Sequence, residues 1–251
     1  MDAPDPERVG GIAWLERTNG ALTVTERRRL RRAILRGQLS GAADRIRLLT
    51  GRRATEPMAV PSPPDSALAR DAERAAAEQP AILAAHAYRT WAFGRALAAV
   101  DGAASLDEEL FYVASLLHDA GLDVSVPGED FTLRSGRIAA GVVEPHRDHG
   151  AVRSVQDAIS AHCTPGATVA VDGPEAFYVQ AGATLDLGGL RLPELTGDLV
   201  DAVLDAYPRT GVVADIAARV RAEAAAVPEG RFGLLNRTGF VAAVRISPLP
   251  R

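Results

Sequence analysis

Apolar residues recur at helical spacing along most of the chain, and the alternation typical of strands is scarce. Near the middle, Leu110, Ala114 and Leu117 repeat every three or four residues and lead to His118 and Asp119. This spacing turns the His118 imidazole toward the core, where an unpaired polar group costs about 1–3 kcal/mol or more. The pattern predicts an all-α fold in which a buried His-Asp pair needs a partner.

Start and stop signals divide the chain into helices. Thr23 and Glu26 form a capping box, and we expect the helix that they begin to stop at Gly37. Ser105 and Glu108 form a second capping box for the helix that leads to His118, which Gly121 should end. Further helices are expected over residues 42–50, 66–78, 80–100, 131–143, 151–162, 174–188, 197–206, 211–226 and 234–244.

The first sixty residues differ from the rest in charge. Arginines crowd residues 27–36, and the proline-rich stretch Pro57–Pro64 follows. We therefore expect residues 1–60 to form a basic helical N-terminal extension and residues 61–251 to form the main domain. The arginines indicate either a solvated helix face or a surface for a phosphate-rich or protein partner. No aromatic residues lie among them, which argues against single-stranded nucleic acid.

Composition narrows the class of protein. A chain of 251 residues with 47% hydrophobic residues can bury a full core, and its net charge of −4 does not suggest nucleic-acid binding. The single cysteine, Cys163, excludes an internal disulfide and fits a reducing compartment. The N-terminus is acidic and proline-rich, and no apolar run reaches the roughly 20 residues that span a bilayer. We expect a cytoplasmic protein that does not enter a membrane.

Several expected helices each turn a metal-competent side chain toward the core. His86 shares a face with Leu83 and Phe93, and His162 follows Val152, Val155 and Ile159 at helical spacing. An inward carboxylate, here Asp186, is rarer than an inward histidine, because carboxylates are almost never fully buried without a partner. Together these side chains predict a mixed nitrogen and oxygen site for one divalent ion, with zinc favoured and iron or manganese as alternatives. The inward side chains are His86, His118, Asp119, His162 and Asp186, and two imidazoles with two carboxylates would form the site.

The order of these residues resembles the HD-domain superfamily of metal-dependent hydrolases, and more specifically its cyanamide-hydratase-like branch. The resemblance covers roughly residues 64–246, which would make residues 61–251 an HD-domain helical bundle. It rests on Ala85–Gly94, Leu116–Leu122, Ala158–His162, Gly182–Gly189 and Tyr207–Arg209.

The resemblance implies a role for each motif residue. His86, His118, Asp119 and Asp186 would bind the metal, and His162 would be the catalytic residue that orients substrate or moves a proton. Two further positions bear on the chemistry. Arg89 follows the family's His-x-x-Arg pattern, and we interpret it as a structural ion-pair partner. Thr132 stands where the family usually has Glu. This difference argues against the hydratase reaction that gives the branch its name more than it argues against metal binding.

These features predict a hydrolase or hydro-lyase that adds metal-activated water to a small nitrile-like or amide-like molecule. A first alternative is a phosphohydrolase acting on nucleotides or other phosphate esters, with Arg89, Arg134 and Arg137 as clamps. A second uses two metals and recruits His146 or His149 together with His162. A third is a non-catalytic protein that binds a partner through its basic extension. The expected partner is a small-molecule substrate, and a homo-oligomer is left open.

Overall fold

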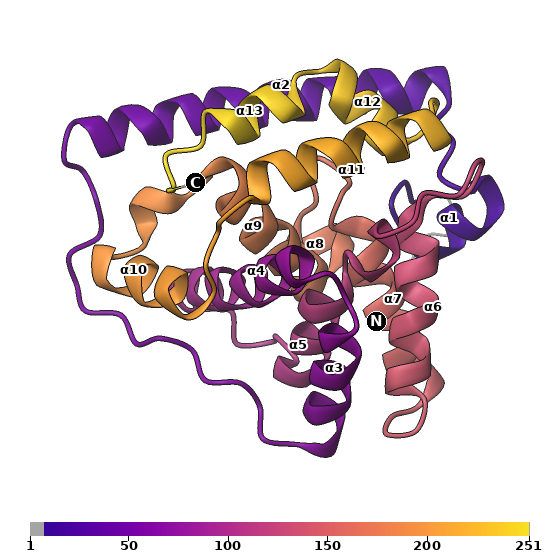
Figure 1. Ribbon diagram of the computed structural model, residues 1–251, viewed down its shortest axis with the longest axis horizontal. Helices are drawn as coiled ribbons and strands as arrows, with labels where there is room; N and C mark the ends of the chain where they lie inside the picture. Colours follow the sequence, from indigo (N-terminus) through magenta and orange to yellow (C-terminus); the bar gives the residue numbers. More distant parts are fainter. Residues whose placement is uncertain (1–7, 251) are drawn as a thin grey trace.

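The computed structural model describes residues 8–250 and confirms the all-α fold, since this range contains helices and no strand (Figure 1). The acidic N-terminus, residues 1–7, lies outside it. The α-helices are α1 (Ile12–Thr18), α2 (Val24–Leu49), α3 (Ala67–Ala77), α4 (Ala81–Val100), α5 (Glu108–Leu117), α6 (Phe131–Val143), α7 (His149–Ala161), α8 (Val169–Asp172), α9 (Pro174–Gly188), α10 (Gly197–Ala206), α11 (Val212–Ala226), α12 (Arg231–Arg237) and α13 (Phe240–Arg245). Two 3-10 turns, η1 (Ala120–Leu122) and η2 (Leu192–Glu194), complete the description.

Helices α4 and α9 make the most extensive contact between helices in the described range, and glycines set their spacing. A Cβ atom at Gly94 would overlap the Tyr178 carbonyl oxygen, and one at Gly182 would overlap the Thr90 carbonyl oxygen. The two helices are antiparallel, so a step of four residues forward along α9 corresponds to a step of four residues backward along α4. The facing pairs are Gly94 with Tyr178, Thr90 with Gly182, and His86 with Asp186.

The expected stop at Gly37 is wrong, because α2 is one continuous helix from Val24 to Leu49. A glycine ends a helix when it adopts the left-handed conformation, and Gly37 does not, whereas Gly51 beyond the helix has a φ of 70°. In a helix interior, glycine costs only about 1 kcal/mol relative to alanine. The Thr23–Glu26 capping box that begins α2 is confirmed.

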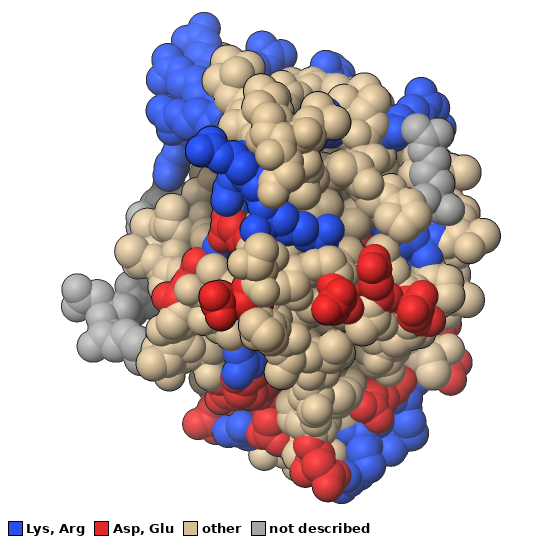
Figure 2. All heavy atoms as spheres, turned by 90° about the vertical axis from the view of Figure 1, so that its left-hand side faces the viewer, with Lys and Arg blue, Asp and Glu red and all other residues tan. Residues whose placement is uncertain are grey.

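The N-terminal segment is helical, as predicted, and it packs on the remainder of the protein. Ile12, Trp14 and Leu15 of α1 are buried, and the Ile12 backbone N–H donates to Asp157 at 2.7 Å. Helix α2 lies along α12 and α13 at the top of Figure 1. Figure 2 shows arginine side chains gathered at this upper edge of the molecule. A domain boundary between residues 60 and 61 stays a prediction.

Two other helix signals differ from expectation. Asp107 caps α5, since its side chain accepts from the backbone N–H groups of Glu109 and Leu110, so the Ser105–Glu108 capping box is wrong. The helix expected over residues 234–244 is divided into α12 and α13 at Gly239, whose φ is 89°. Within residues 8–250, no helix combines the length and apolar character needed to cross a bilayer.

Candidate metal centre

Three helices deliver a compact group of polar side chains to the protein interior. His86 lies within α4, His118 and Asp119 follow the last residue of α5, and His162 follows the last residue of α7. Their exposed fractions are 1%, 0%, 4% and 7%, respectively. The helical spacing therefore predicted the burial of these side chains correctly.

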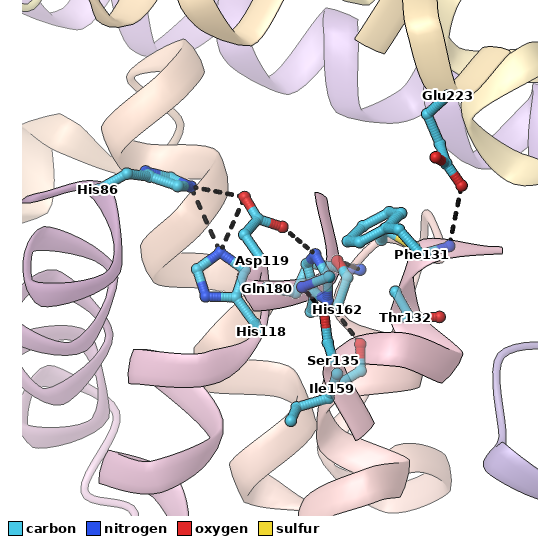
Figure 3. A network of polar contacts seen from close by, with 12 residues as sticks. His86, His118, Asp119, Phe131, Thr132, Ser135, Ile159, His162, Gln180 and Glu223 are labelled. Carbon is cyan, nitrogen blue, oxygen red and sulfur yellow. Dashed lines mark hydrogen bonds and ion pairs between the residues drawn. The ribbon is translucent and has the colours of Figure 1, made fainter. Parts of the chain in front are cut away.

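The imidazoles of His86 and His118 and the carboxylate of Asp119 converge on one point (Figure 3). The two Nε2 atoms lie 3.4 Å apart, and Asp119 Oδ2 lies 3.5 Å from His118 Nε2 and 3.7 Å from His86 Nε2. Ligand atoms about 2.0–2.2 Å from a tetrahedral ion are separated by about 3.3–3.6 Å. His86, His118 and Asp119 thus form a buried group with the spacing to hold a metal ion.

The hydrogen bonds behind the rings fix which nitrogen faces the centre. His118 Nδ1 lies 2.7 Å from the Ser115 carbonyl oxygen, which can only accept, so Nδ1 carries the proton. His86 Nδ1 lies 2.6 Å from the Asp186 carboxylate in the same manner. In the neutral rings both Nε2 atoms therefore present lone pairs to the centre, beside a carboxylate. Because the atoms that face the centre are all hydrogen-bond acceptors, a cation between them would be stabilised.

Charge and burial agree with this interpretation. Burial first, and then the neighbouring His162 and His86, lower the pKa of His118 to about 3, although the charge of Asp119 acts in the opposite direction. Burial by itself would raise the pKa of Asp119, but the adjacent imidazoles, His118 first, hold it below its ordinary value. At neutral pH the centre contains a neutral imidazole and an ionised carboxylate, which is the state that binds metal. The second oxygen, Asp119 Oδ1, is buried without a hydrogen-bond partner and lies on the side of His162.

Asp186, the expected fourth ligand, lies behind the His86 ring and outside the metal-capable group. Its Oδ2 accepts from His86 Nδ1, and its Oδ1 accepts from Arg89 Nε at 2.7 Å and from Arg209 Nε at 3.0 Å. A carboxylate in this position orients a metal-binding histidine and increases its basicity. Although burial raises the pKa of Asp186, the hydrogen bond from His86 and the charge of Arg89 keep it below the ordinary value.

Arg89 and Arg209 hold Asp186 in place. Arg89 is fully buried, and it donates to both oxygens of Asp186 and to the backbone carbonyls of Tyr207 and Pro208. The interpretation of Arg89 as a structural ion-pair partner agrees with these contacts. Arg209 also donates to the Asp186 backbone carbonyl at 2.6 Å. The sequence did not predict this role of Arg209, because Arg209 lies in a loop where no helical periodicity connects it to the centre.

His162 approaches the same centre from the opposite side of Asp119. Its Nε2 lies 3.5 Å from Asp119 Oδ1, and its Nδ1 lies 2.5 Å from the Ile159 carbonyl oxygen. As in His118, Nδ1 faces the carbonyl three residues earlier and Nε2 is directed inward (Figure 3). Gln180 fixes the turn that carries His162 by donating to the carbonyl of His162 at 2.9 Å.

A cavity of about 560 Å³ opens above these side chains. Its floor includes His86, His118, Asp119 and His162, and its walls come from α2, α9, α11, α12 and α13. The volume lies within the range of about 300–1,000 Å³ that is typical of small-molecule sites. The metal-capable group thus faces a space that a ligand can occupy.

Other residues named from the sequence lie away from the cavity. Arg134 pairs with Glu223 and Glu129, and Arg137 pairs with Glu129, so neither arginine lines the cavity. His146 bonds to Asp71 at 2.7 Å. Neither His146 nor His149 belongs to a metal-capable group within residues 8–250.

Thr132 does not line the cavity either. Its hydroxyl donates to Asp130 at 2.7 Å and accepts from the buried Arg231 at 2.8 Å. Arg231 in turn donates to the Ser160 carbonyl, so this network connects α12 to the helix that carries His162. The residue that departs from the family pattern therefore has a structural partner in this protein.

Comparison with known protein families finds no family model that matches this chain, and no curated protein matches it. The site and its surroundings carry the functional argument.

Proposed function

We propose that this protein is a metal-dependent hydrolase or hydro-lyase of the HD type, which adds water to a small molecule held in the cavity. The observation that carries the proposal is the convergence of His86 Nε2, His118 Nε2 and Asp119 Oδ2 on one buried point at the cavity floor. The all-α bundle and the order of its motifs support it. The proposal places the protein in the cytoplasm with a small-molecule substrate.

His86, His118 and Asp119 would hold one divalent ion, with zinc favoured over iron or manganese because two imidazoles and a carboxylate are typical zinc ligands. With an ion bound there, the centre would supply a water molecule of lowered pKa and would polarise a substrate carbonyl, nitrile or phosphoryl group. Asp186 would orient His86 from behind rather than complete the ligand set, in contrast to the role implied by the family resemblance.

His162 is the proposed catalytic residue. It lines the cavity, and its Nε2 lies beside Asp119 Oδ1, so a proton can pass between the imidazole and a substrate atom at the centre. The Ile159 carbonyl holds the ring in this orientation. An imidazole at this position suits either protonation of a leaving group or removal of a proton from water.

The cavity lining favours a nitrile-like or amide-like group over a phosphate ester. A phosphate needs cationic clamps. Arg89 is engaged by Asp186, while Arg134 and Arg137 pair with glutamates outside the cavity. The three arginines expected as clamps for the phosphohydrolase alternative are therefore engaged elsewhere, and among the described residues a single arginine, Arg45, lines the cavity.

Metal analysis together with a substrate panel tests the proposal. We expect about one zinc ion per purified chain, with little metal in H118A. The panel compares nitriles and amides with nucleotides and other phosphate esters. Activity is measured as the release of ammonia, amide or phosphate. H146A, which alters a partly exposed histidine outside the centre, is the matched control and should keep its metal. A folded wild-type chain without stoichiometric metal would refute the mechanism, and phosphate release alone would favour the alternative.

A further inference from the structure

The wall of the cavity formed by α2 has an unusual composition. Ala33, Gly37, Gly41 and Arg45 line the cavity and recur every four residues, so they share one face of the helix. Small residues occupy the first three positions, and a long cation occupies the fourth. At about 1.5 Å per residue, this face extends about 18 Å from Ala33 to Arg45. The cavity is therefore bounded along α2 by an open apolar stretch that ends at one positive charge.

Arg45 has no carboxylate partner among the described residues. Its Nε atom is buried without a hydrogen-bond partner. The carboxylate next to it in sequence, Asp44, instead accepts from Arg47 at 3.3 Å and from the backbone N–H of Arg191 at 2.8 Å. A buried donor on a cationic side chain is costly when unpaired, and an anion in the cavity would satisfy it.

The neutral polar side chains of the lining are already engaged. Gln38 donates to the Thr238 carbonyl at 2.8 Å, and the Thr184 hydroxyl donates to the Gln180 carbonyl at 2.8 Å. The Gln180 amide donates to backbone carbonyls near His162. A sugar or a nucleobase rich in hydrogen-bonding groups would therefore find few free partners here. The remaining wall is mostly aliphatic, with the aromatic rings of Phe232 and Phe240.

We propose that the substrate is an anionic amphipathic small molecule, whose apolar body fills the cavity beneath α2 and whose anionic group pairs with Arg45. This inference rests on the proposed function for the reaction itself, because it places the reacting group at the His86, His118 and Asp119 centre. It goes beyond that function because the smallest nitriles would leave most of a 560 Å³ cavity unfilled, so a larger substrate is expected. It also assigns Arg45 a role in specificity.

Binding of unreactive probes tests the inference separately from catalysis. Decanoate, decanol and decylamine have the same chain and differ in charge, and butyrate has the charge without the apolar body. Calorimetric titration of the purified full-length protein should give decanoate an affinity at least about tenfold higher than that of each other probe. R45Q should remove the preference of decanoate over decanol. R36Q, which alters an exposed arginine of α2 outside the cavity, should preserve it.

A second pair of variants tests the location. Gly37 lines the cavity, and a Cβ atom there would meet no other atom within 4 Å, so G37F is chosen to add bulk at this wall. G141F is the matched control, because Gly141 is also helical and equally unobstructed but does not line the cavity. We expect G37F to abolish binding of the ten-carbon probes and to retain metal, whereas G141F should bind them normally.

Titration of chelator-treated protein distinguishes binding of the anionic group by Arg45 from binding of that group by the metal. We expect decanoate to bind after chelation with little change in affinity, and R45Q to weaken that binding. Decanoate affinity that depends on metal and not on Arg45 would overturn the inference, as would equal affinities for decanoate and decanol. Both results can occur in a protein that purifies with stoichiometric metal, so they are distinct from a failure of the proposed function, which is an absence of stoichiometric metal.

Discussion

His86 Nδ1 and Asp186 Oδ2 lie 2.6 Å apart, so the carboxylate supports the metal-facing imidazole from the side opposite the metal-capable centre. Both side chains are buried, and Arg89 and Arg209 neutralise the Asp186 charge. This relationship separates two possible roles for Asp186. A ligand is required for metal binding, whereas an orienting carboxylate adjusts its strength.

We expect D186N to bind metal about 10–100-fold more weakly and still reach one ion per chain at high metal concentration. The variant should also lose about 3–5 kcal/mol of stability, since Arg89 and Arg209 lose their buried counter-ion. Competition with a chelating dye measures the first effect, and urea denaturation measures the second. H118A, which removes a member of the centre, should bind no ion. A folded D186N that binds no metal at saturation would identify Asp186 as a ligand.

The metal-free protein should lose stability as the pH falls from about 6.5 to about 3. Burial lowers the pKa of His118 from 6.5 to about 3 in the folded protein. The unfolded chain therefore binds a proton in this interval that the folded chain excludes, so its free energy of unfolding rises with pH. One such group contributes a slope of about 1.4 kcal/mol per pH unit.

Urea denaturation of chelator-treated protein between pH 4 and pH 7 measures this slope. H118N should reduce it, because the group that excludes the proton is gone. H146N changes a partly exposed histidine outside the centre and serves as the control. Equal slopes for H118N and the wild type would contradict the assignment.

Gly182 should tolerate no side chain, because a Cβ atom there would overlap the Thr90 carbonyl oxygen of α4. We expect G182A to cost about 1–3 kcal/mol and to weaken metal binding, since α4 and α9 must separate where His86 faces Asp186. G141A on the exposed surface of α6 is the control and should be neutral or stabilising by up to about 1 kcal/mol. Thermal unfolding and metal titration distinguish the two variants, and wild-type behaviour of G182A would exclude this packing.

Helix α2 should contribute to the stability of the whole protein rather than form an independent arm. Leu30 is 3% exposed, and Leu35 on the same helix is 57% exposed. We expect L30A to cost about 2–4 kcal/mol and L35A to change stability by less than about 0.5 kcal/mol. A single cooperative unfolding transition should be seen for both. Equal, small effects would indicate that residues 8–60 fold separately.

Helical periodicity was sufficient to predict the all-α fold and the burial of His86, His118, His162 and Asp186. It could not predict which edge of the His86 ring Asp186 would meet, because periodicity gives the face of a helix and not the rotation of a side chain. That outcome depends on Arg89 and Arg209, and Arg209 lies in a loop without periodicity.

The sequence also could not predict the cavity. Gly37 was interpreted as a stop signal, although in the structure it gives α2 a small residue where the helix passes over the cavity. A glycine in a helix costs little when packing holds both neighbouring turns, and that packing involves residues close to the other end of the chain. The division between α12 and α13 at Gly239 follows from a positive φ that sequence spacing did not indicate.

The walls of the cavity come from both ends of the described chain, α2 at one end and α12 with α13 at the other, while the metal-capable residues lie between them. During synthesis the histidines therefore leave the ribosome before the last wall exists, so the metal-capable group is made while the chamber is still open. Mutations in the terminal helices can likewise alter the walls over generations without changing the metal-capable side chains.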